Sequence, residues 1–258
     1  RILGKVAIFE KGYADVSVVA KSSGGHSSRP GKGTSLGRCC KAVAAIEAAQ
    51  FEPSLCSVVE DFLKTIAHIV TEEPLKTWLS DLPAHRQQLI DYLYQNDDLA
   101  PLVHTTTAAT MMTGSPAPNV LPQRVEAVFN FRTSPADSCA AVVQHCIQAV
   151  NDPEVEITLL RGMEPSKISK SSSLGMDVIR AATEKFYPAV TVVPMLVTGG
   201  TDCRYFEEIC DCCYRFRPFL DNMPLGHTGH GTNERCSLSA YGHGIKVFIE
   251  VMKNACFA

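Results

Sequence analysis

The chain has 258 residues, of which 45% are hydrophobic and 20% charged, a composition typical of globular proteins. Its formal net charge of −3 gives no basic stripe, so we expect no nucleic-acid partner. The longest apolar runs, such as Val190 to Val197, are well short of the ~18–20 residues of a membrane span. We therefore expect no membrane span in this chain.

Two features bear on how the chain begins and where it resides. Residue 1 is not Met, and Ile2 to Phe9 already reads as a buried strand instead of a leader peptide, so we expect either processing or an upstream segment. The 11 cysteines are odd in number, and the neighbours Cys39-Cys40 and Cys212-Cys213 are poor disulfide partners for each other. Reduced thiols and an intracellular compartment are the expectation.

The first 160 residues predict a layer of helices on an antiparallel sheet. Five segments read as strands, four of them after residue 13, and a Leu- and Glu-rich stretch at 51–102 reads as a helical insert. Ser134 to Asp137, with a capping residue, a proline and an acid, predicts a helix start. The order from residue 13 is β-α-(insert)-β-β-α-β, which is typical of a ferredoxin-like fold. In chain order the expected elements are strands Ile2–Phe9 and Asp15–Ala20, a helix from Thr34 or Ser35 to Ala49, the insert, strands Thr105–Met112 and Val125–Arg132, a helix to Val150 and strand Val155–Leu160.

Residues 165–258 alternate between helix and strand, which indicates part of a parallel α/β sheet. Only about two strands are expected here, whereas a self-sufficient sheet has ~4–6. The expected elements are helix Ser172–Phe186, strands Val190–Val197 and Cys212–Phe219, and helix Ser237–Asn254 with Leu238, Tyr241, Ile245, Phe248 and Met252 as its buried stripe.

His26 stands in a loop rich in glycine and serine, just before a helix N-terminus. A histidine in such a loop could donate a hydrogen bond to an oxyanion or a carboxylate. The alternative is a solvent-exposed loop histidine. A phosphate loop is rejected, because His26 stands where the first glycine of that motif is required and Gly33 where Ser or Thr is required.

The segment Thr198 to Arg204 follows a buried strand and ends on an arginine. Ligands of open α/β sheets bind beyond the carboxyl ends of the strands. Arg204 could therefore grip a substrate carboxylate with both arms of its guanidinium group. The alternative is a tight glycine turn with a solvated Arg204.

A polar segment near the C-terminus contains His227 and His230, a spacing compatible with one or two metal ligands. A rival interpretation is a structural zinc cluster of nearby cysteines, but their spacing lacks paired C-x-x-C units. The plainest interpretation makes these cysteines small core residues. They are Cys203, Cys210, Cys212, Cys213 and Cys236.

Four motifs occur in one order: G-G-H-S-S-R-P from Gly24, N-V-L-P from Asn119, T-G-G-T-D-C-R-Y-F from Thr198 and H-G-T-N-E from His230. Together they resemble the zinc metallopeptidase and amidohydrolase superfamily of aminoacylase, carboxypeptidase G and succinyl-diaminopimelate desuccinylase. The similarity is greatest to its branch of carboxypeptidase S and the N-acyl-amino-acid hydrolases. It extends from about Val6 to Asn254.

The resemblance implies a ferredoxin-like α+β lid, often homodimeric, inserted in an α/β zinc-peptidase domain of which only the C-terminal part is present. Residues 1–12 would end the N-terminal part of that catalytic domain. Residues 13–162 would form the lid with its insert, and residues 163–258 the C-terminal part. The complete enzyme would hold two zinc ions.

The resemblance also implies roles for individual residues. His230 resembles a metal ligand, and His26 resembles the lid histidine that stabilises the oxyanion in the partner subunit's active site. Asn119 resembles a lid residue that binds the substrate carboxylate or the intermediate. Arg204 resembles the residue that grips the carboxylate, on a turn formed by Gly199, Gly200 and Thr201.

The family's other metal ligands and its general base lie upstream of the lid, and this sequence has no such segment. At most one ligand is present here, so we expect a hydrolase fragment that is inactive alone. The complete enzyme would cleave amide bonds of N-acyl amino acids or short peptides that carry a free carboxylate. The alternative is a naturally truncated, non-catalytic dimerisation or binding module of the same fold, and a structural zinc module is a third hypothesis.

Overall fold

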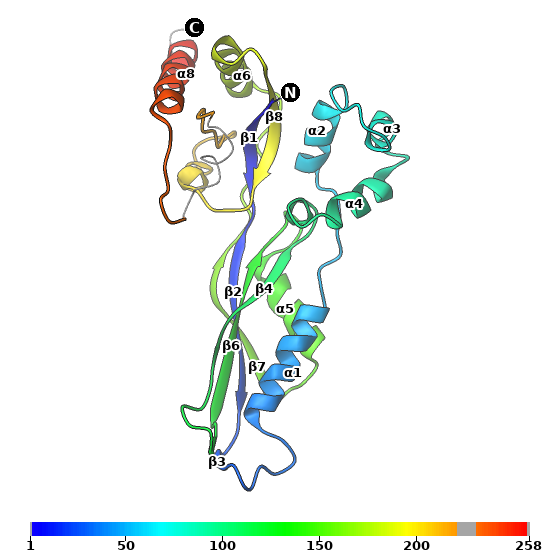
Figure 1. Cartoon of the computed structure of the whole chain (residues 1–258), viewed down its shortest axis with the longest axis vertical. Coiled ribbons are helices and arrows are strands. Elements are labelled where there is room, and N and C mark those ends of the chain that lie inside the picture. The colour runs from blue at the N-terminus through cyan, green and yellow to red at the C-terminus, as the bar shows by residue number, and fades with distance from the viewer. Residues whose placement is uncertain (1, 221–230, 257–258) are drawn as a thin grey trace.

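The computed structural model describes residues 2–220 and 231–256 and contains two main sheets that lie end to end (Figure 1). One is a parallel pair, β1-β8, and the other is antiparallel with the order β4-β6-β2-β7. A short pair, β3-β5, lies at the far end of the second sheet. The strands are β1 Ile2–Glu10, β2 Tyr13–Lys21, β3 Gly25–His26, β4 Thr106–Thr113, β5 Val120–Leu121, β6 Arg124–Arg132, β7 Val155–Met163 and β8 Val190–Val197.

The antiparallel sheet has the order and the helices of the predicted ferredoxin-like layer. Helices α1 (Ser35–Ala48) and α5 (Cys139–Val150) cover one face of it. Strand β6 alternates as predicted, because every second residue points at these helices and is fully buried. Burying each large side chain of this kind contributes roughly 1.5–3 kcal/mol. These residues of β6 are Val125, Ala127, Phe129 and Phe131.

Both strands of the parallel pair β1-β8 are deeply buried. Five consecutive residues at the end of β1 and five within β8 are buried, a pattern typical of strands covered on both faces. Helices α6 (Leu174–Phe186) and α8 (Leu238–Cys256) belong to this part of the chain, and α6 contributes Met176 and Ile179 to its core.

The helical insert packs on the β1-β8 sheet, and not within the core of the antiparallel sheet. Its helices are α2 (Ser57–Ile66), α3 (Leu75–Ser80), α4 (Arg86–Tyr94) and the short η1 (Ala100–Leu102). The apolar face of α2, which includes Phe62, shares one hydrophobic cluster with Ile8 of β1 and Val193 of β8. The insert, which follows α1 of the antiparallel sheet in the chain, therefore ties that part of the chain to the β1-β8 sheet, as the position of α2 beside β8 shows (Figure 1).

The two sheets are joined at Lys11 and Gly12, between β1 and β2. Gly12 exchanges two backbone hydrogen bonds of 3.1 Å with Thr133, and a Cβ atom on Gly12 would lie 2.8 Å from the carbonyl oxygen of Met163. Only glycine allows the chain segments to cross this closely. The Lys11 ammonium donates to the carbonyl oxygens of Pro101 at 2.8 Å and His104 at 2.6 Å, which anchors the returning end of the insert to the crossing.

Helix α5 begins at Cys139, so the predicted start at Ser134 to Asp137 is wrong. The hydroxyl of Thr105 accepts from the Ser134 amide and donates to the Asp137 carboxylate, which holds this segment as a turn. Ser138 then caps the helix by accepting from the Ala141 amide at 3.1 Å.

The strand expected at Cys212–Phe219 is also wrong, because this segment makes a single antiparallel bridge between Arg215 and Ala7. The Cys213 amide is bonded to the Ser169 hydroxyl at 2.8 Å, and Pro218 has no N–H, so the ladder cannot extend.

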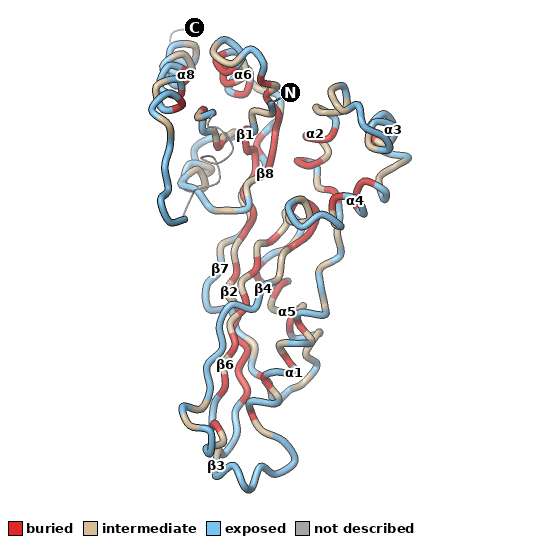
Figure 2. The backbone as a smooth tube through the Cα atoms, viewed as in Figure 1, coloured by how far each residue is buried: buried red, intermediate tan, exposed pale blue. Residues whose placement is uncertain are grey.

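The predicted buried stripe of the C-terminal helix is the exposed side of α8. Its buried residues are Ala240, Gly244 and Val247, and Gly244 lies directly against the ring of Phe219. The pale segments of α8 in Figure 2 are its exposed residues, although the rings of Tyr241 and Phe248 lie 5.7 Å and 6.4 Å from the ring of Phe219. The residues of the predicted stripe are large and apolar and are 39–90% exposed. These are Leu238, Tyr241, Ile245, Phe248 and Met252.

Within residues 2–220 and 231–256, no helix combines the length and the apolar content that crossing a membrane requires.

Candidate functional site

A polar network lies where β1 and β8 end. Parallel strands bring their carboxyl ends to the same edge of a sheet, which is where ligands of such sheets bind. Glu10 is the last residue of β1, and the turn through Gly199 and Gly200 follows β8. Thr201 ends this turn and caps the short helix η2 (Asp202–Phe206), accepting from the Cys203 amide at 3.2 Å.

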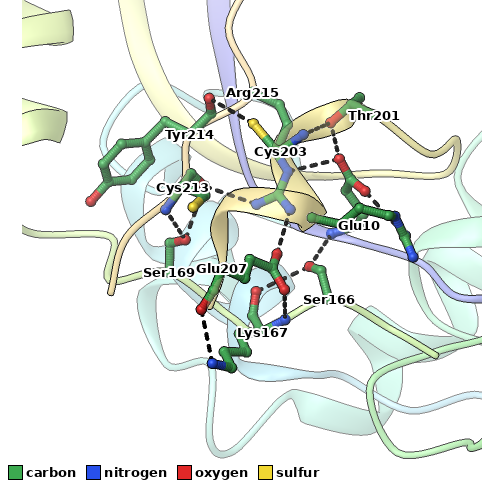
Figure 3. Close-up of polar contacts among 11 residues, drawn as sticks. Glu10, Ser166, Lys167, Ser169, Thr201, Cys203, Glu207, Cys213, Tyr214 and Arg215 are labelled. Atoms are coloured by element: carbon green, nitrogen blue, oxygen red, sulfur yellow. Dashed lines mark hydrogen bonds and ion pairs between the residues drawn. The ribbon is translucent and has the colours of Figure 1, made fainter. Parts of the chain in front are cut away.

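The carboxylate of Glu10 is fully buried at the centre of this network (Figure 3). One oxygen accepts from the Arg215 Nε atom at 2.9 Å and from the Thr201 hydroxyl, and the other accepts from the Arg204 Nη2 atom at 3.1 Å. The Glu10 amide also donates to the Ser166 hydroxyl at 2.8 Å. A buried carboxylate is tolerated only when it is paired in this way.

Arg215 is held by two carboxylates. Besides Glu10, it donates from Nη2 to a carboxylate oxygen of Glu207 at 2.7 Å, and from Nη1 to the carbonyl oxygen of Cys213 at 2.8 Å. The other Glu207 carboxylate oxygen accepts from the Lys167 amide at 2.9 Å. Arg215 thus makes one contact through each of its three guanidinium nitrogens.

Arg204 differs from Arg215 in how its donors are used. Its side chain is 12% exposed, so the alternative of a solvated Arg204 on a plain glycine turn is wrong. It makes a single contact with Glu10 through Nη2, and its buried Nε atom has no hydrogen-bond partner among the described residues. A guanidinium group has five N–H donors, so donors of Arg204 remain available.

The pKa values of Glu10 and Arg215 reflect this pairing. Burial alone raises the pKa of Glu10, but hydrogen bonds from Thr201 and Arg215 outweigh it and leave the pKa below its ordinary value. Burial lowers the pKa of Arg215, and hydrogen bonds to Glu10 and Glu207 more than reverse that effect. Glu10 and Arg215 therefore remain ionised at neutral pH.

A hollow of about 650 Å³ lies beside η2 and is lined mainly by apolar atoms. Met195 of β8, Phe206 of η2 and Phe216 contribute to its walls, together with Thr201 and Arg215. Arg204 does not line this hollow. The hollow is therefore a separate feature from the donors that Arg204 keeps available.

The structure places His26 and Asn119 together, but far from Arg204. Strand β3 pairs with β5, the Ser27 amide donates to the Asn119 carbonyl at 3.0 Å, and both His26 and Asn119 are exposed. The Nδ1 atom of His26 lies 2.9 Å from the Ser28 hydroxyl. The length of the antiparallel sheet separates this tip from η2 (Figure 1), and nine residues of β2 alone span roughly 30 Å at ~3.3 Å per residue.

The predicted metal ligand His230, and His227 with it, lie outside the described residues. Among the residues that the structure does describe, no three His, Cys, Asp or Glu side chains are grouped so that they could hold a metal ion. The described cysteines therefore do not form the zinc cluster considered as a rival interpretation.

Sequence reasoning missed Glu10, Arg215 and Glu207. The available signal was Glu10 itself, an acid at the end of an otherwise apolar strand. Nothing in the spacing of Arg215, 205 positions away, indicates that it pairs with Glu10.

Comparisons with known proteins agree with the fold. The family model described as the peptidase dimerisation domain matches residues 8–158. The chain is 30% identical over 254 residues to the N-fatty-acyl-amino acid synthase/hydrolase PM20D1 of Bos taurus, covering 96% of this chain and 50% of that protein. It is 27% identical over 256 residues to the probable carboxypeptidase S-like 2 of Dictyostelium discoideum, covering 98% and 48%. The chain thus spans about half the length of the curated relatives it matches.

Solved structures show the same fold at low identity. An M20 family metallo-carboxypeptidase, Sso-CP2 from Sulfolobus solfataricus, matches with a TM-score of 0.62 and 15% identity, covering 97% of this chain and 60% of that one. The di-peptidase Dug1p from Saccharomyces cerevisiae matches with a TM-score of 0.60 and 14% identity, covering 98% and 57%. At such identities the likeness establishes the fold alone.

Proposed function

This chain belongs to the M20 peptidase family, in the branch of carboxypeptidase S and the N-acyl-amino-acid hydrolases, and from that premise we propose that it supplies the lid and C-terminal half of a metal-dependent amide hydrolase. The substrates are N-acyl amino acids or short peptides with a free carboxylate. In this proposal residues 13–162 are the lid, and residues 1–12 and 163–258 belong to the catalytic domain.

The observation that carries this proposal is the burial of Arg204 and the incomplete hydrogen bonding of its guanidinium group. Its guanidinium group is nearly buried at the carboxyl end of a parallel sheet, next to the turn of Gly199, Gly200 and Thr201, and it keeps donors unpaired. Two N–H groups in one plane match the two oxygens of a carboxylate. In our proposal Arg204 binds the free carboxylate of the substrate, and the glycines allow the substrate to approach the backbone.

The metal site of the complete enzyme is proposed to hold two zinc ions, with His230 as the one ligand that this chain contributes. The described residues do not form a zinc site by themselves. Zinc in such enzymes lowers the pKa of a water molecule that attacks the amide. The remaining ligands and the general base must come from polypeptide outside this chain, so the chain alone is expected to be inactive.

The separation of His26 from Arg204 supports a site shared between two subunits. Within one chain, β3, which contains His26, lies at the end of the antiparallel sheet that is far from β8, and Arg204 belongs to η2 after β8 (Figure 1). A two-fold homodimer would bring the tip of one lid to the catalytic half of its partner. There His26 would donate to the oxyanion that forms during amide cleavage, and Asn119 would bind the substrate carboxylate or that intermediate.

We place the interface of this homodimer at β4, an edge strand of the antiparallel sheet. It pairs with β6 on one side only, and its outer residues Ala108, Ala109, Met111 and Met112 are exposed. An unpaired edge strand with apolar side chains is a template for pairing with another strand. Two copies of β4 related by a two-fold axis would extend the antiparallel sheet across the dimer.

The exposed apolar residues around α8 support the presence of further polypeptide in the complete enzyme. Besides the exposed side of α8, Tyr205 of η2 and Ile209 just after it are each more than 70% exposed. Apolar surface gathered in this way marks an interface, because globular proteins seldom leave it in water.

The test is to express residues 1–258 as part of one polypeptide with the upstream half, add zinc and assay N-decanoyl-L-phenylalanine and dipeptides. Hydrolysis that a chelator abolishes is the expected result, and the 258-residue chain alone serves as the inactive control. Absence of hydrolysis of every N-acyl amino acid and dipeptide would overturn the proposal.

A second candidate is a non-catalytic dimerisation module, favoured by the fact that the family match at residues 8–158 covers the dimerisation domain itself. It predicts a transcript that starts near residue 1 and a soluble dimer of this chain alone. Transcript sequence upstream of residue 1 discriminates between the two.

A further inference from the structure

We propose that Glu10 is the positioning residue for Arg204. Its carboxylate accepts one hydrogen bond from the Arg204 guanidinium group and leaves the other N–H donors free to bind the substrate carboxylate. This inference rests on the proposed function, because it concerns the same carboxylate-binding site. None of the four sequence motifs includes Glu10.

Glu10 is suited to this role because it is itself fixed. Its backbone belongs to β1, and its amide donates to the Ser166 hydroxyl at 2.8 Å. Its Oε1 atom is held by Arg215 and Thr201, so the Oε2 atom is presented to Arg204 in one orientation. A side chain held at its backbone and at one carboxylate oxygen has little freedom left to lose when a ligand binds.

The contact that Glu10 makes with Arg204 is also limited. A carboxylate that bound Arg204 through two parallel hydrogen bonds would use the same fork that a substrate needs. The structure has one contact instead, 3.1 Å from Nη2 to Oε2, while the buried Nε atom of Arg204 has no partner within residues 2–220 and 231–256. Glu10 therefore orients the guanidinium group without satisfying it.

Sharing Glu10 between two arginines keeps Arg204 electropositive. Arg215 takes the Oε1 atom of Glu10 and is also paired with Glu207 at 2.7 Å, whereas Arg204 has no second carboxylate among its described contacts. Arg204 therefore shares its only carboxylate with another cation, which favours the arrival of an anionic group. Thr201, whose hydroxyl also donates to Glu10, links the same carboxylate to the glycine turn.

The experiment uses the full polypeptide with zinc and compares two substrates, N-decanoyl-L-phenylalanine and its primary amide, which lacks the carboxylate. The measured quantity is the ratio of kcat/KM for the acid to kcat/KM for the amide. For Glu10→Gln we expect this ratio to fall about tenfold, mainly through a higher KM for the acid. A loss of merely structural origin would lower both values and leave the ratio unchanged.

Glu10→Asp is the second variant, in case Glu10→Gln does not fold. It keeps the negative charge beside the two arginines but shortens the side chain, so the carboxylate cannot reach Arg215 and Arg204 together. We expect the same fall in the ratio, by about tenfold. Glu207→Gln is the matched control, because Glu207 contacts Arg215 and not Arg204, and its ratio should stay within about threefold of the wild-type value.

The outcomes separate this inference from the proposed function. If the wild-type polypeptide hydrolyses neither substrate, the proposed function fails, and the inference fails with it. If the wild type is active and Glu10→Asp keeps the wild-type ratio, the positioning role alone is overturned. An equal fall in the ratio for Glu207→Gln would also overturn it, since the effect would then belong to the whole network.

Discussion

The ammonium group of Lys11 lies 2.6 Å from the backbone carbonyl oxygen of His104, and this contact joins the crossing between the two sheets to the returning end of the helical insert. Lys11 is 2% exposed, and its second acceptor is another carbonyl oxygen, that of Pro101. Neither acceptor carries a charge. Burial therefore lowers the pKa of Lys11 from 10.5 to about 8.

This lowered pKa predicts that the contribution of Lys11 to stability grows as the pH rises from about 8 to 10.5, whereas buried thiols with raised pKa values, such as Cys146, contribute the opposite trend. In that window the unfolded chain keeps the Lys11 proton and the folded chain releases it, so the part of the free energy of unfolding that Lys11 contributes increases with pH. The slope contributed by one group is at most about 1.4 kcal/mol per pH unit. Below pH 8 both states are protonated, and Lys11 contributes no slope.

Urea denaturation at several pH values measures this effect in the wild type and in Lys11→Met. We expect the difference in the free energy of unfolding between the wild type and Lys11→Met to shift in favour of the wild type between pH 8 and 10.5. The exposed Lys32→Met is the control and should follow the wild-type profile. Identical pH profiles for the wild type and Lys11→Met would show that Lys11 is not responsible.

Gly12→Ala should destabilise the same crossing. The new Cβ atom would lie 2.2 Å from the Thr133 hydroxyl oxygen and 2.8 Å from both the Met163 carbonyl oxygen and the Pro165 nitrogen. Backbone atoms cannot move aside as a flexible side chain can, so we expect a loss of about 1–3 kcal/mol in the free energy of unfolding. Gly33→Ala, where a Cβ atom meets nothing within 4 Å, is the matched control in the same urea experiment.

The sequence predicted correctly those features that depend on residues close together in the chain. Residues Val125 to Phe131 alternate within one strand, and Thr34 caps α1 by accepting from the Gly37 amide, so both features followed from neighbouring residues. The start of α5 did not, because Thr105 holds the segment before it from 29 positions away in sequence.

The site shows the same limit. Motifs identified Arg204 and its turn, but Glu10 and Arg215 meet it only through the parallel pairing of β1 with β8 and the bridge from Ala7 to Arg215. The apolar residues of α8 follow helical spacing on both sides, so periodicity alone could not tell which side packs inside this chain. The Phe219 ring approaches α8 directly at Gly244, which has no side chain, and it also lies near the rings of Tyr241 and Phe248.

Met111→Lys should weaken the proposed homodimer. Met111 is 63% exposed on the edge strand β4, and a lysine there places a charge where two copies would meet. We expect sedimentation velocity to show a shift from dimer to monomer. Leu160→Lys, on the opposite edge strand β7 and 56% exposed, is the control that should remain dimeric. A dimer that persists in Met111→Lys and dissociates in Leu160→Lys would place the interface on the other edge.

Mixed dimers test whether His26 acts in the partner's site. In the full polypeptide, His26→Ala and Arg204→Ala should each lose most activity, because each removes a group from both sites of the dimer. Mixing and exchanging the two variants gives heterodimers in which one site regains both groups. Random exchange makes half of the dimers mixed, so about a quarter of wild-type activity should return.

The control for this experiment is a mixture of His26→Ala with Asn119→Ala. Both residues lie at the same tip of one lid, where the Ser27 amide contacts the Asn119 carbonyl at 3.0 Å, so no arrangement of these two variants restores a complete site. Activity should therefore stay at the level of the single variants. If the mixture of His26→Ala and Arg204→Ala also fails to recover activity, His26 does not act in the partner's site. His26 and Arg204 of the same chain would then have to come together in a different conformation.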